Sequence, residues 1–467
     1  MKTRTQAAIE PAIREIVGSD SVSSSPDDLA RHSYDAWPKA TKWQLRGVRP
    51  FGPELIVQPT TIDHVSRLLA WASENNVSVT PWGLGSSVTG APLPLRGGVS
   101  LDMSAMHALL MLDETNLFVR VQSGKLGIEL EEELNTHGYT LGHSPQSLAR
   151  STVGGWVATR ASGQFSSRYG SIEDLLVGLT VVLPDGEVVE TPMVPRLAAG
   201  PDVRQLFVGS EGTLGVIVEV ALKIFPVAQS RLLETVRFPT VEAGVDAMRR
   251  IMRAGLRPFL VRFYDEDETR HAMAKPGLGG CVMFLGVEGL ASVAAAEFDA
   301  ARSICDASGG ERLGPPGAEA WMGRRFDFST VENLLAEPGG FAETIEVAHF
   351  WDQSLELYRA MKQALAPLAD EVLGHFSHLY PQGTSLYLIL LGHAEDDAAA
   401  EAAIGRIWDT AMRVALEHGA AISHHHGVGI ARLPYVRAAL GSAMIPLRRL
   451  KQALDPANVM NPGKLGL

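Results

Sequence analysis

The sequence predicts an α+β protein with more than one domain, and its length, composition and pattern of apolar residues all support this. A chain of 467 residues exceeds one ordinary hydrophobic core. Its 46% hydrophobic and 20% charged residues are typical of a folded globular protein. We divide the chain by changes in these patterns into a helical segment at 1–50, an α+β domain at 51–228, a second α+β domain at 229–420 and a C-terminal segment at 421–467.

The first domain begins with a strand, a helix and a second strand. Residues 54–59 have the apolar pattern of a strand, and residues 61–76 that of an amphipathic helix with Thr60 or Thr61 near its cap. Residues 77–83 are a strand that ends in a glycine-containing loop. Further strands are expected at 97–103, 117–124 and 214–227, a helix at 126–138, and a hairpin that turns at Pro184-Asp185-Gly186.

The second domain alternates long helices with strands. Helices are expected at 241–255 and 396–419, and strands at 280–289 and 384–394. After residue 447 the chain predicts a helix and then a turn of proline and asparagine.

Charge and cysteine content restrict the compartment and the partners. The formal net charge of −12 argues against nucleic acid and anionic membrane as partners, although a local basic pocket for a small anion remains compatible with it. The two cysteines favour a reducing compartment. The N-terminus lacks the apolar core of a signal peptide, and no run approaches the roughly 20 apolar residues of a membrane span. We expect a cytoplasmic protein without a transmembrane segment.

Three loops rich in glycine and hydroxyl residues, at 80–90, 144–163 and 207–217, are candidates for binding phosphates. Glycine allows close approach of the backbone to a phosphate, and serine adds hydroxyl donors. Neither the dinucleotide fingerprint nor the Walker spacing occurs. The loops suit an extended ligand with a pyrophosphate and a flat ring; a β domain with many ordinary turns is the alternative.

Three consecutive histidines, His424, His425 and His426, lie between an apolar run and a glycine pair. Imidazole titrates near neutrality, so it can transfer protons. It also binds zinc and iron, and His375 and His378 could be neighbours, but such metal sites usually include a carboxylate or thiolate. A polar, hydrogen-bonded corner is a third interpretation. We prefer acid–base chemistry for His425 and His426 and expect no metal.

Five motifs carry a resemblance to a known family: "PWGLGSS", "STVGGWVATRASG", "SIEDLLVGLTVVLPDGEVVET", "GPDVRQLFVGSEGTLGVI" and "NPGKL". They resemble the FAD-binding fold of the vanillyl-alcohol oxidase and p-cresol methylhydroxylase superfamily and, within it, the alkyldihydroxyacetonephosphate synthases. The resemblance implies a PCMH-type FAD-binding domain of two α+β subdomains at 51–228. It also implies an α+β cap domain over the flavin at 229–420 and a C-terminal segment that returns to the flavin site.

The resemblance also implies which residues bind FAD. They are Pro81, Trp82, Gly83, Leu84, Gly85, Ser86, Ser87, Gln146, Ser147, Ser151, Thr152, Gly155, Thr159, Arg160, Ala161, Ser162, Glu211, Gly212, Thr213, Leu214, Gly215, Val216 and Ile217. Gln146 stands where the animal enzymes are expected to have an aspartate. Because the loop at 81–87 has no histidine, FAD is expected to be noncovalent.

The catalytic residues implied by the resemblance are Tyr387 and the three histidines. Tyr387, in "GTSLY", matches the catalytic tyrosine of the family; a strand tyrosine packed in the core is the alternative. Relatives that oxidise 2-hydroxy acids usually bind a divalent metal through an acidic residue in the segment of the triplet. This chain has "SHHHGVG" there, as the ether-lipid enzymes do.

The substrate-binding residues implied by the resemblance are Arg262, His378 and Arg324. Arg262 matches an active-site arginine and would bind an anionic group; a salt bridge to Asp265 is the alternative. Glu332 occupies the position of a substrate-binding arginine of the animal enzymes, so Arg324 or its neighbour Arg325 would have to replace that residue.

The function implied by the resemblance is exchange of the acyl group of acyl-dihydroxyacetone phosphate for a fatty alcohol through a flavin N5 adduct, a step of ether lipid synthesis. The alternative is an FAD-linked oxidase or dehydrogenase of a 2-hydroxy acid or alcohol. In either case the substrate is a small or lipid-like molecule. A homodimer and peripheral contact with a membrane are further expectations.

Overall fold

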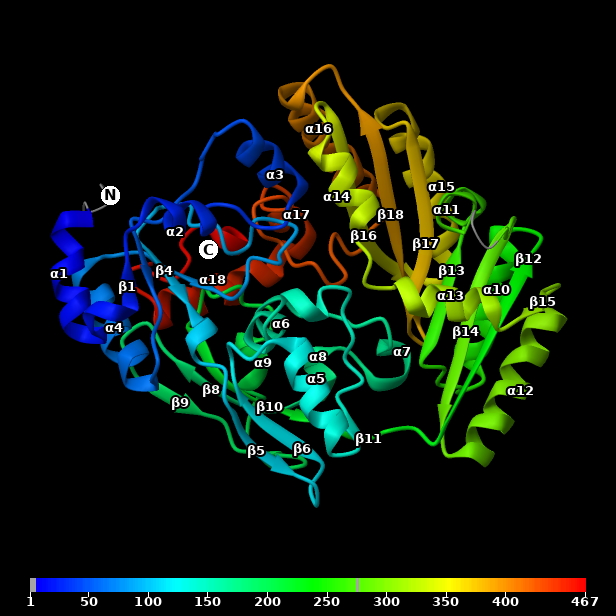
Figure 1. Ribbon diagram of the computed structural model, residues 1–467, viewed down its shortest axis with the longest axis horizontal. Coiled ribbons are helices and arrows are strands. Elements are labelled where there is room, and N and C mark those ends of the chain that lie inside the picture. Colours follow the sequence, from blue (N-terminus) through cyan, green and yellow to red (C-terminus); the bar gives the residue numbers. More distant parts are fainter. Residues whose placement is uncertain (1–5, 274–276) are drawn as a thin grey trace.

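The structure is a computed structural model that describes residues 6–273 and 277–467. Figure 1 shows a large twisted sheet standing beside a body that contains two smaller sheets, and the first described helix and the C-terminus lie on that body. Within the described residues, no helix is long and apolar enough to cross a membrane.

The first small sheet contains the predicted strand–helix–strand unit. Its strands, in order across the sheet, are β1 (Val22–Ser23), β2 (Leu55–Val57), β4 (Val99–Asp102) and β3 (Val79–Trp82). β2 and β3 both run parallel to β4, which lies between them. The connecting helix α4 (Ile62–Asn75) begins at Thr61, whose hydroxyl accepts a hydrogen bond from the backbone N–H of His64. The preceding helix α1 (Gln6–Val17) packs on α4.

The second small sheet is antiparallel, with the order β5 (Leu109–Asp113), β6 (Phe118–Gln122), β10 (Val216–Lys223), β8 (Leu176–Val182) and β9 (Val188–Glu190). The predicted hairpin is the pair β8 and β9. The segment 144–163, expected to be a loop, instead contains helix α6 (Val153–Thr159). The Thr152 hydroxyl accepts from the N–H of Gly155 at its start. Glycine is needed at 154, because a Cβ there would meet the Ser123 Cβ at 2.6 Å.

The large sheet has seven strands, in the order β15 (Glu311–Gly314), β12 (Ser230–Phe238), β14 (Cys281–Gly289), β13 (Leu260–Tyr264), β17 (Glu371–Leu379), β18 (Gly383–His393) and β16 (Gly340–Phe350). Alternate side chains point to opposite faces. One face packs on α10 (Val241–Arg253), α12 (Ala291–Ala307), α15 (Trp351–Leu365) and α16 (Asp397–Glu417). The other face carries α11 (Glu266–Ala272), α13 (Pro316–Arg324) and α14 (Ser329–Ala336), and between them it turns toward the smaller sheets (Figure 1).

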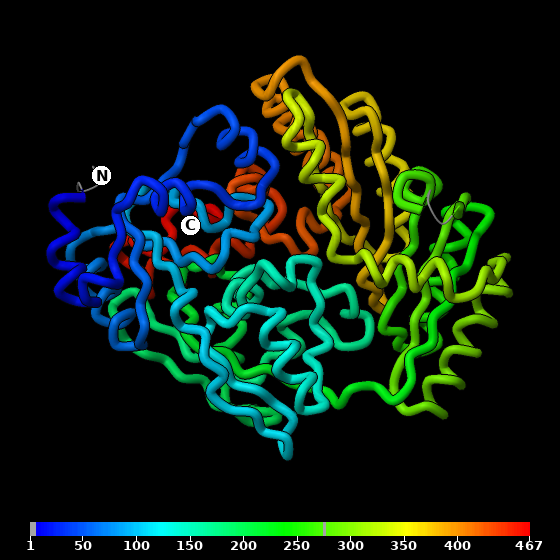
Figure 2. Tube along the Cα trace, in the orientation of Figure 1, coloured from blue at the N-terminus to red at the C-terminus, as the bar shows by residue number. Residues whose placement is uncertain are grey.

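The C-terminal segment runs back into the body of small sheets, where Figure 2 shows it in red beside the blue N-terminal part. It contains α17 (Val436–Leu440) and α18 (Met444–Leu454). Near the end of the chain, Met460 forms an isolated parallel β-bridge with Val79. The Lys464 ammonium donates to the carbonyls of Gly90, Ala91 and Leu93. The end of the chain therefore fixes the loop that follows β3.

The remaining short elements connect these layers. They are α2 (Pro26–Arg31), α3 (Pro38–Leu45), α5 (Gly127–Thr136), β7 (Tyr139–Thr140), α7 (Ser166–Tyr169), α8 (Ile172–Leu175), α9 (Arg204–Phe207), β11 (Phe225–Pro226) and six 3₁₀ turns, at 19–21, 103–105, 148–150, 366–368, 441–443 and 464–466.

Candidate active site

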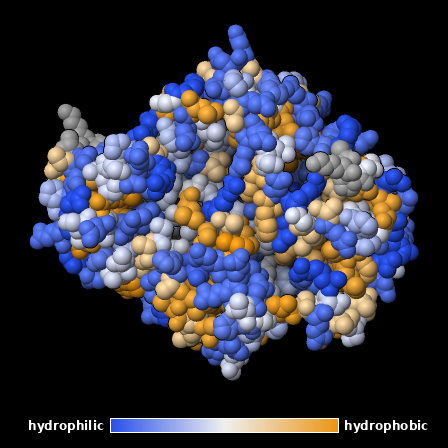
Figure 3. Space-filling view, viewed as in Figure 1, coloured by the Kyte–Doolittle hydropathy of each residue, from blue (hydrophilic) through white to orange (hydrophobic). Residues whose placement is uncertain are grey.

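A cavity of about 830 Å³ lies between the large sheet and the body of small sheets. One wall consists of the loop after β3, the segment 145–152 and the segment 210–217. The opposite wall consists of side chains from β13, β17 and β18, with α13 and α14 beside them. The space-filling view is hollowed between the two halves of the molecule, with apolar side chains at the bottom of the hollow (Figure 3).

The loop after β3 presents free backbone donors. The N–H groups of Leu84, Gly85, Ser86 and Ser87 donate to no acceptor within the residues that the structure describes. Gly83 lies so close to Thr152 that a Cβ would meet the threonine hydroxyl at 2.6 Å. Consecutive unpaired N–H groups around glycine bind anions, so this wall fits the pyrophosphate of FAD.

Most of the residues expected to bind FAD line this cavity. Three do not: Arg160, Thr213 and Leu214. The Arg160 side chain pairs with Glu173 at 3.1 Å, the Thr213 hydroxyl donates to a backbone carbonyl at 2.7 Å, and Leu214 packs in the core. Their roles at the cofactor remain predictions, as do those of the residues in the wall.

Glu211 lines the cavity but directs its carboxylate toward the loop that follows the histidine triplet. Its two oxygens accept from the backbone N–H groups of Val428 at 2.5 Å and Gly429 at 2.9 Å. Burial raises the pKa of this carboxyl, and the two N–H donors and the charges of Lys464 and Arg432 oppose that increase. Glu211 therefore connects the cofactor wall to the histidines.

Four polar side chains form a row across the cavity face of the large sheet. Tyr264 on β13 is paired with His375 on β17, His375 with Tyr387 on β18, and Tyr387 with Glu346 on β16. Directly paired residues point to the same face, so the four lie side by side. The Tyr387 ring stacks on His375 with ring centres 4.8 Å apart, and burial raises the pKa of its phenol to about 12. Tyr387 therefore reaches the cavity as a neutral proton donor.

The histidine triplet approaches Tyr387 from the loop after α16. The His425 and His426 rings line the cavity, whereas His424 lies behind them, with Nε2 2.8 Å from the Tyr380 hydroxyl. Burial lowers the pKa of His424 and of His426 to about 4 and that of His425 well below its ordinary value. All three rings are therefore neutral near pH 7.

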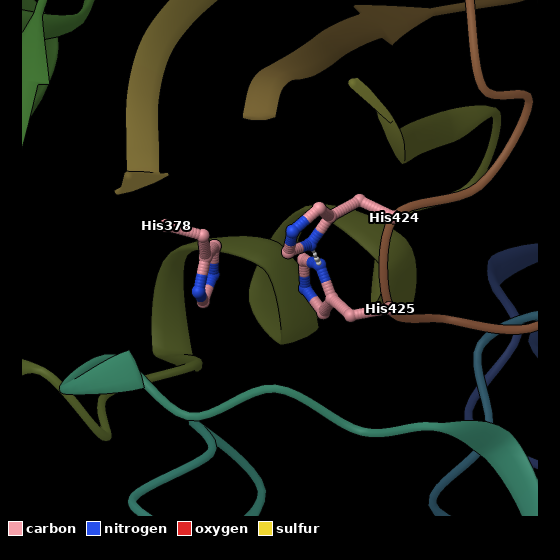
Figure 4. Close-up of side chains that lie close together, drawn as sticks. All are labelled: His378, His424 and His425. Carbon is pink, nitrogen blue, oxygen red and sulfur yellow. Dashed lines mark hydrogen bonds between the residues drawn. The ribbon is translucent and has the colours of Figure 1, made fainter. Parts of the chain in front are cut away.

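His378 faces the triplet from a bulge at the end of β17, where it adopts a left-handed backbone with φ of 53°. Its Nδ1 lies 3.1 Å from the Ser162 hydroxyl and 2.8 Å from that of Ser166. Figure 4 shows that the His424 and His425 rings point toward His378. Nitrogens of these three histidines lie within 4.8 Å of one another, a spacing at which a metal ion could be held. However, the Nδ1 atoms of His424 and His425 form a hydrogen bond of 2.8 Å with each other, and the expectation of no metal remains a prediction.

Arg262 lines the cavity beside an acidic partner that the sequence did not suggest. Glu268 on α11 lies 3.9 Å from the Arg262 guanidinium, and its carboxylate is 2.7 Å from His375 Nδ1. Burial raises the pKa of Glu268 to about 7. The expected alternative partner, Asp265, instead pairs with Lys362 at 2.9 Å.

Glu332 lies at the cavity wall and pairs with Arg150 at 2.5 Å. This ion pair joins α14, on the large sheet, to the segment 145–152 on the other wall, and both side chains are more than half exposed. Arg324 and Arg325 also line the cavity, and neither has a carboxylate within 4.0 Å in the described part of the chain. The Arg324 guanidinium contacts the Met273 sulfur.

Sequence reasoning missed four charged residues of this site: Arg150, Glu268, Glu346 and Arg432. Each contacts a residue at least 80 positions away along the chain. Arg150 lies inside the segment 144–163 and Arg432 follows the histidine triplet closely, but other residues of those segments carried the interpretation, and Glu268 and Glu346 stand in segments without a motif. The signal that could have found Glu346 is a carboxylate among the apolar residues of a strand that also contains Glu343, because a carboxylate buried in a strand requires a partner.

Comparison with known proteins defines the class of this molecule. Residues 53–192 match the FAD binding domain family, and residues 227–465 match the C-terminal domain of FAD linked oxidases. The chain belongs to this family: it is a flavoenzyme, FAD is its cofactor, and it acts on a small-molecule substrate.

Individual relatives include both synthases and oxidoreductases. The chain is 30% identical to an alkyldihydroxyacetonephosphate synthase of Trypanosoma brucei brucei, over 91% of this chain and 75% of the relative. It is 32% identical to the uncharacterized FAD-linked oxidoreductase YgcU of Escherichia coli K12, over 99% and 98%. It is 30% identical to a mitochondrial D-lactate dehydrogenase (cytochrome) of Arabidopsis thaliana, over 88% and 73%.

Solved structures confirm the predicted fold class. An alkyldihydroxyacetonephosphate synthase superposes with a TM-score of 0.81 at 26% identity and covers 98% of this chain and 85% of its own. A p-cresol methylhydroxylase superposes with a TM-score of 0.83 at 17% identity over 99% and 98%, which shows the shared PCMH-type fold.

Proposed function

We propose that this flavoenzyme exchanges the acyl group of acyl-dihydroxyacetone phosphate for a fatty alcohol. The ester C–O bond at the terminal carbon of the substrate breaks, and an ether C–O bond to the alcohol oxygen forms at the same carbon. The fatty acid leaves as a carboxylate, and the hydroxyl proton of the alcohol is released. Atoms and charge balance without any net oxidation, so no electron acceptor is required.

The observation that carries this proposal is the combination of surfaces in one cavity. Tyr387 and the histidines, which can transfer protons, line one part of it, and arginines line the walls. Apolar side chains of α14, β17 and β18 line a further part, here called the apolar branch. This branch is lined by Val331, Leu335, Leu373, Ile389 and Leu391. Each methylene of an alkyl chain buried there would contribute about 0.8 kcal/mol.

The arginines of the cavity support an anionic substrate. Arg324 and Arg325 have no carboxylate within 4.0 Å in the described residues, and Arg150 has only an exposed partner. A guanidinium binds a phosphate through two parallel hydrogen bonds. We assign Arg262 to the reacting end of the substrate, because it lies 3.4 Å from His375, which stacks on Tyr387.

The protein's own groups would manage protons and exclude water. The N–H groups at 84–87 would hold the pyrophosphate of FAD, and the flavin ring would supply a group that can exchange electron pairs with the substrate carbon. Tyr387, neutral in its buried position, donates a proton or a hydrogen bond to the substrate oxygen. The neutral histidines accept the proton released by the incoming alcohol.

A second candidate is oxidation of an alcohol or 2-hydroxy acid. The similarity to a D-lactate dehydrogenase and the carboxylate of Glu332 in the cavity wall favour it. In that reaction two electrons and the proton of the C–H bond would pass from the substrate to the cofactor, a histidine of the site would take the hydroxyl proton, and the electrons would go on to an acceptor. A homodimer with peripheral membrane contact remains a prediction for either activity.

The test uses the FAD-loaded protein, acyl-dihydroxyacetone phosphate and a deuterated fatty alcohol. We expect mass spectrometry to show the deuterated ether product together with free fatty acid. Tyr387→Phe and His425→Ala are expected to retain FAD and to lose about a hundredfold or more of the exchange rate. Full activity in both variants would contradict the site, and oxidation of a hydroxy acid without exchange would favour the second candidate.

A further inference from the structure

The loop that carries the histidine triplet is held by a buried carboxylate, Glu346, which is 0% exposed. One oxygen, Oε1, accepts from the Ser423 hydroxyl at 3.0 Å and from the His426 backbone N–H at 2.9 Å. The other oxygen accepts from the backbone N–H of His424. A charged acceptor with several donors fixes a loop more firmly than neutral contacts do.

An equally buried arginine holds the same loop through its carbonyl groups. Arg432 is 0% exposed and donates to the carbonyl of Ile422 at 2.6 Å and to that of Gly427 at 2.8 Å. Its guanidinium also pairs with Glu346 at 2.9 Å and lies over the Trp408 ring. Burial, the largest single effect, raises the pKa of Glu346, but the Arg432 charge, the neighbouring histidines and the backbone N–H of His424 together outweigh it, and the net effect lowers that pKa. Glu346 therefore remains ionised in the folded protein.

The three histidine rings differ in what their nitrogens contact. Both nitrogens of His424 are occupied, Nδ1 by His425 and Nε2 by the Tyr380 hydroxyl. His426 makes no ring hydrogen bond within the described residues. Its Nδ1 is buried and lies 3.6 Å from the Glu346 carboxylate, a distance too long for a hydrogen bond but close enough for an ion pair once the ring is protonated.

We propose that Glu346 is a positioning residue that makes His426 the proton-carrying histidine of the triplet. This inference rests on the acid–base role in the proposed function and assigns one step of it, uptake of the hydroxyl proton, to one ring; the other proton transfers stay with Tyr387 and His425. His426 would take the hydroxyl proton of the incoming substrate on the side that faces the cavity. Its Nδ1–H would then face Glu346, which stays ionised and takes no proton. The imidazolium would release its proton to solvent or to the next substrate oxygen.

Charged and titratable side chains surround the His426 ring on several sides. Glu346 on β16 faces Nδ1, and Arg432 lies on the far side of that carboxylate. The His425 ring lies 4.4 Å away within the loop, and Tyr387 on β18 lies edge-on at 5.6 Å. In this set Glu346 is the anion, so its removal should destabilise the protonated ring of His426.

The first test measures proton affinity without a substrate. In FAD-loaded protein with ¹⁵N-labelled histidine, the His426 resonance is assigned by its loss in His426→Gln and titrated in wild type and in Glu346→Gln. We expect the proton affinity of His426 to fall at least about tenfold in Glu346→Gln. An unchanged titration of His426 would overturn the proposal. Because no substrate is needed, this result is independent of whether exchange is the true reaction.

The second test is a double-mutant cycle on turnover, with either candidate substrate. Glu346→Gln and His426→Gln should each lower kcat at least about a hundredfold with KM and FAD content little changed, and the double variant should be no slower than His426→Gln alone. In the double variant Glu346→Gln and His424→Gln, by contrast, the losses of kcat caused by the two substitutions should multiply. If the losses of kcat multiply equally when Glu346→Gln is combined with His426→Gln and with His424→Gln, Glu346 has a merely structural role and the proposal is wrong.

A second variant controls for misfolding of Glu346→Gln. That variant leaves Arg432 buried without its partner, so the pair Glu346→Gln and Arg432→Met removes both charges together. This double variant should bind FAD and still show the weakened proton affinity of His426. A normal His426 titration in it would contradict the proposal.

Discussion

The Arg150–Glu332 pair allows a prediction in which two substitutions have opposite effects. Both side chains are more than half exposed, so the pair itself contributes about 0.2–1 kcal/mol. If Arg150 binds the phosphate of the substrate, Glu332 competes with that phosphate. Glu332→Gln removes the competitor and should lower KM up to about fivefold. Arg150→Gln removes a charge-assisted contact of about 1.5–3 kcal/mol and should raise KM about ten- to hundredfold.

The assay compares acyl-dihydroxyacetone phosphate with the same ester lacking the phosphate. The KM for the uncharged ester should change less than about twofold in either variant, because neither residue then meets an anion. Glu311→Gln is a matched control, since Glu311 forms a comparably exposed pair with Arg237 away from the cavity, and it should have no effect. A raised KM in Glu332→Gln, or equal effects on both esters, would refute the reasoning.

Three further predictions concern other parts of the cavity. Gly83→Val should weaken FAD binding at least about tenfold in a fluorescence titration, because even a Cβ would meet a threonine hydroxyl at 2.6 Å; unchanged affinity would contradict the assigned loop. Val331→Trp should fill the apolar branch and reduce exchange of long-chain alcohols at least about tenfold while sparing short ones, as measured by product formation; an equal loss for all lengths would argue against a chain-binding branch. Dialysis against a chelator should leave activity intact, and metal analysis should find no stoichiometric ion at His378, His424 and His425; loss of activity restored by zinc would contradict acid–base chemistry there.

The local parts of the fold follow from the sequence because their signals are local. The strand–helix–strand unit around α4 has an apolar period of its own and a threonine cap, and the β8–β9 hairpin has a proline-aspartate-glycine turn. The order of strands in the sheets, in contrast, could not be predicted from local signals. β4 lies between β2 and β3, and β16 lies at the edge of the large sheet beside β18, because pairing over long separations depends on packing that no short window contains.

The site was predictable where motifs carry it and not where single residues do. Tyr387 and the triplet could be selected because their neighbourhoods resemble a family. Glu346 and Arg432 were harder to select, because a carboxylate in a strand and an arginine after a loop usually face solvent. Glu346 and Arg432 are 86 residues apart in the sequence, and only the fold shows that their side chains form a hydrogen bond. Buried charges then become informative, because they need partners.

The most direct measurement of the central claim is an anaerobic stopped-flow experiment on the FAD-loaded protein. We expect acyl-dihydroxyacetone phosphate to bleach the visible flavin absorbance and a fatty alcohol, added second, to restore it as the ether product forms, without any electron acceptor. Bleaching that persists after the alcohol and is reversed only by an electron acceptor would contradict the account and make this enzyme an oxidoreductase.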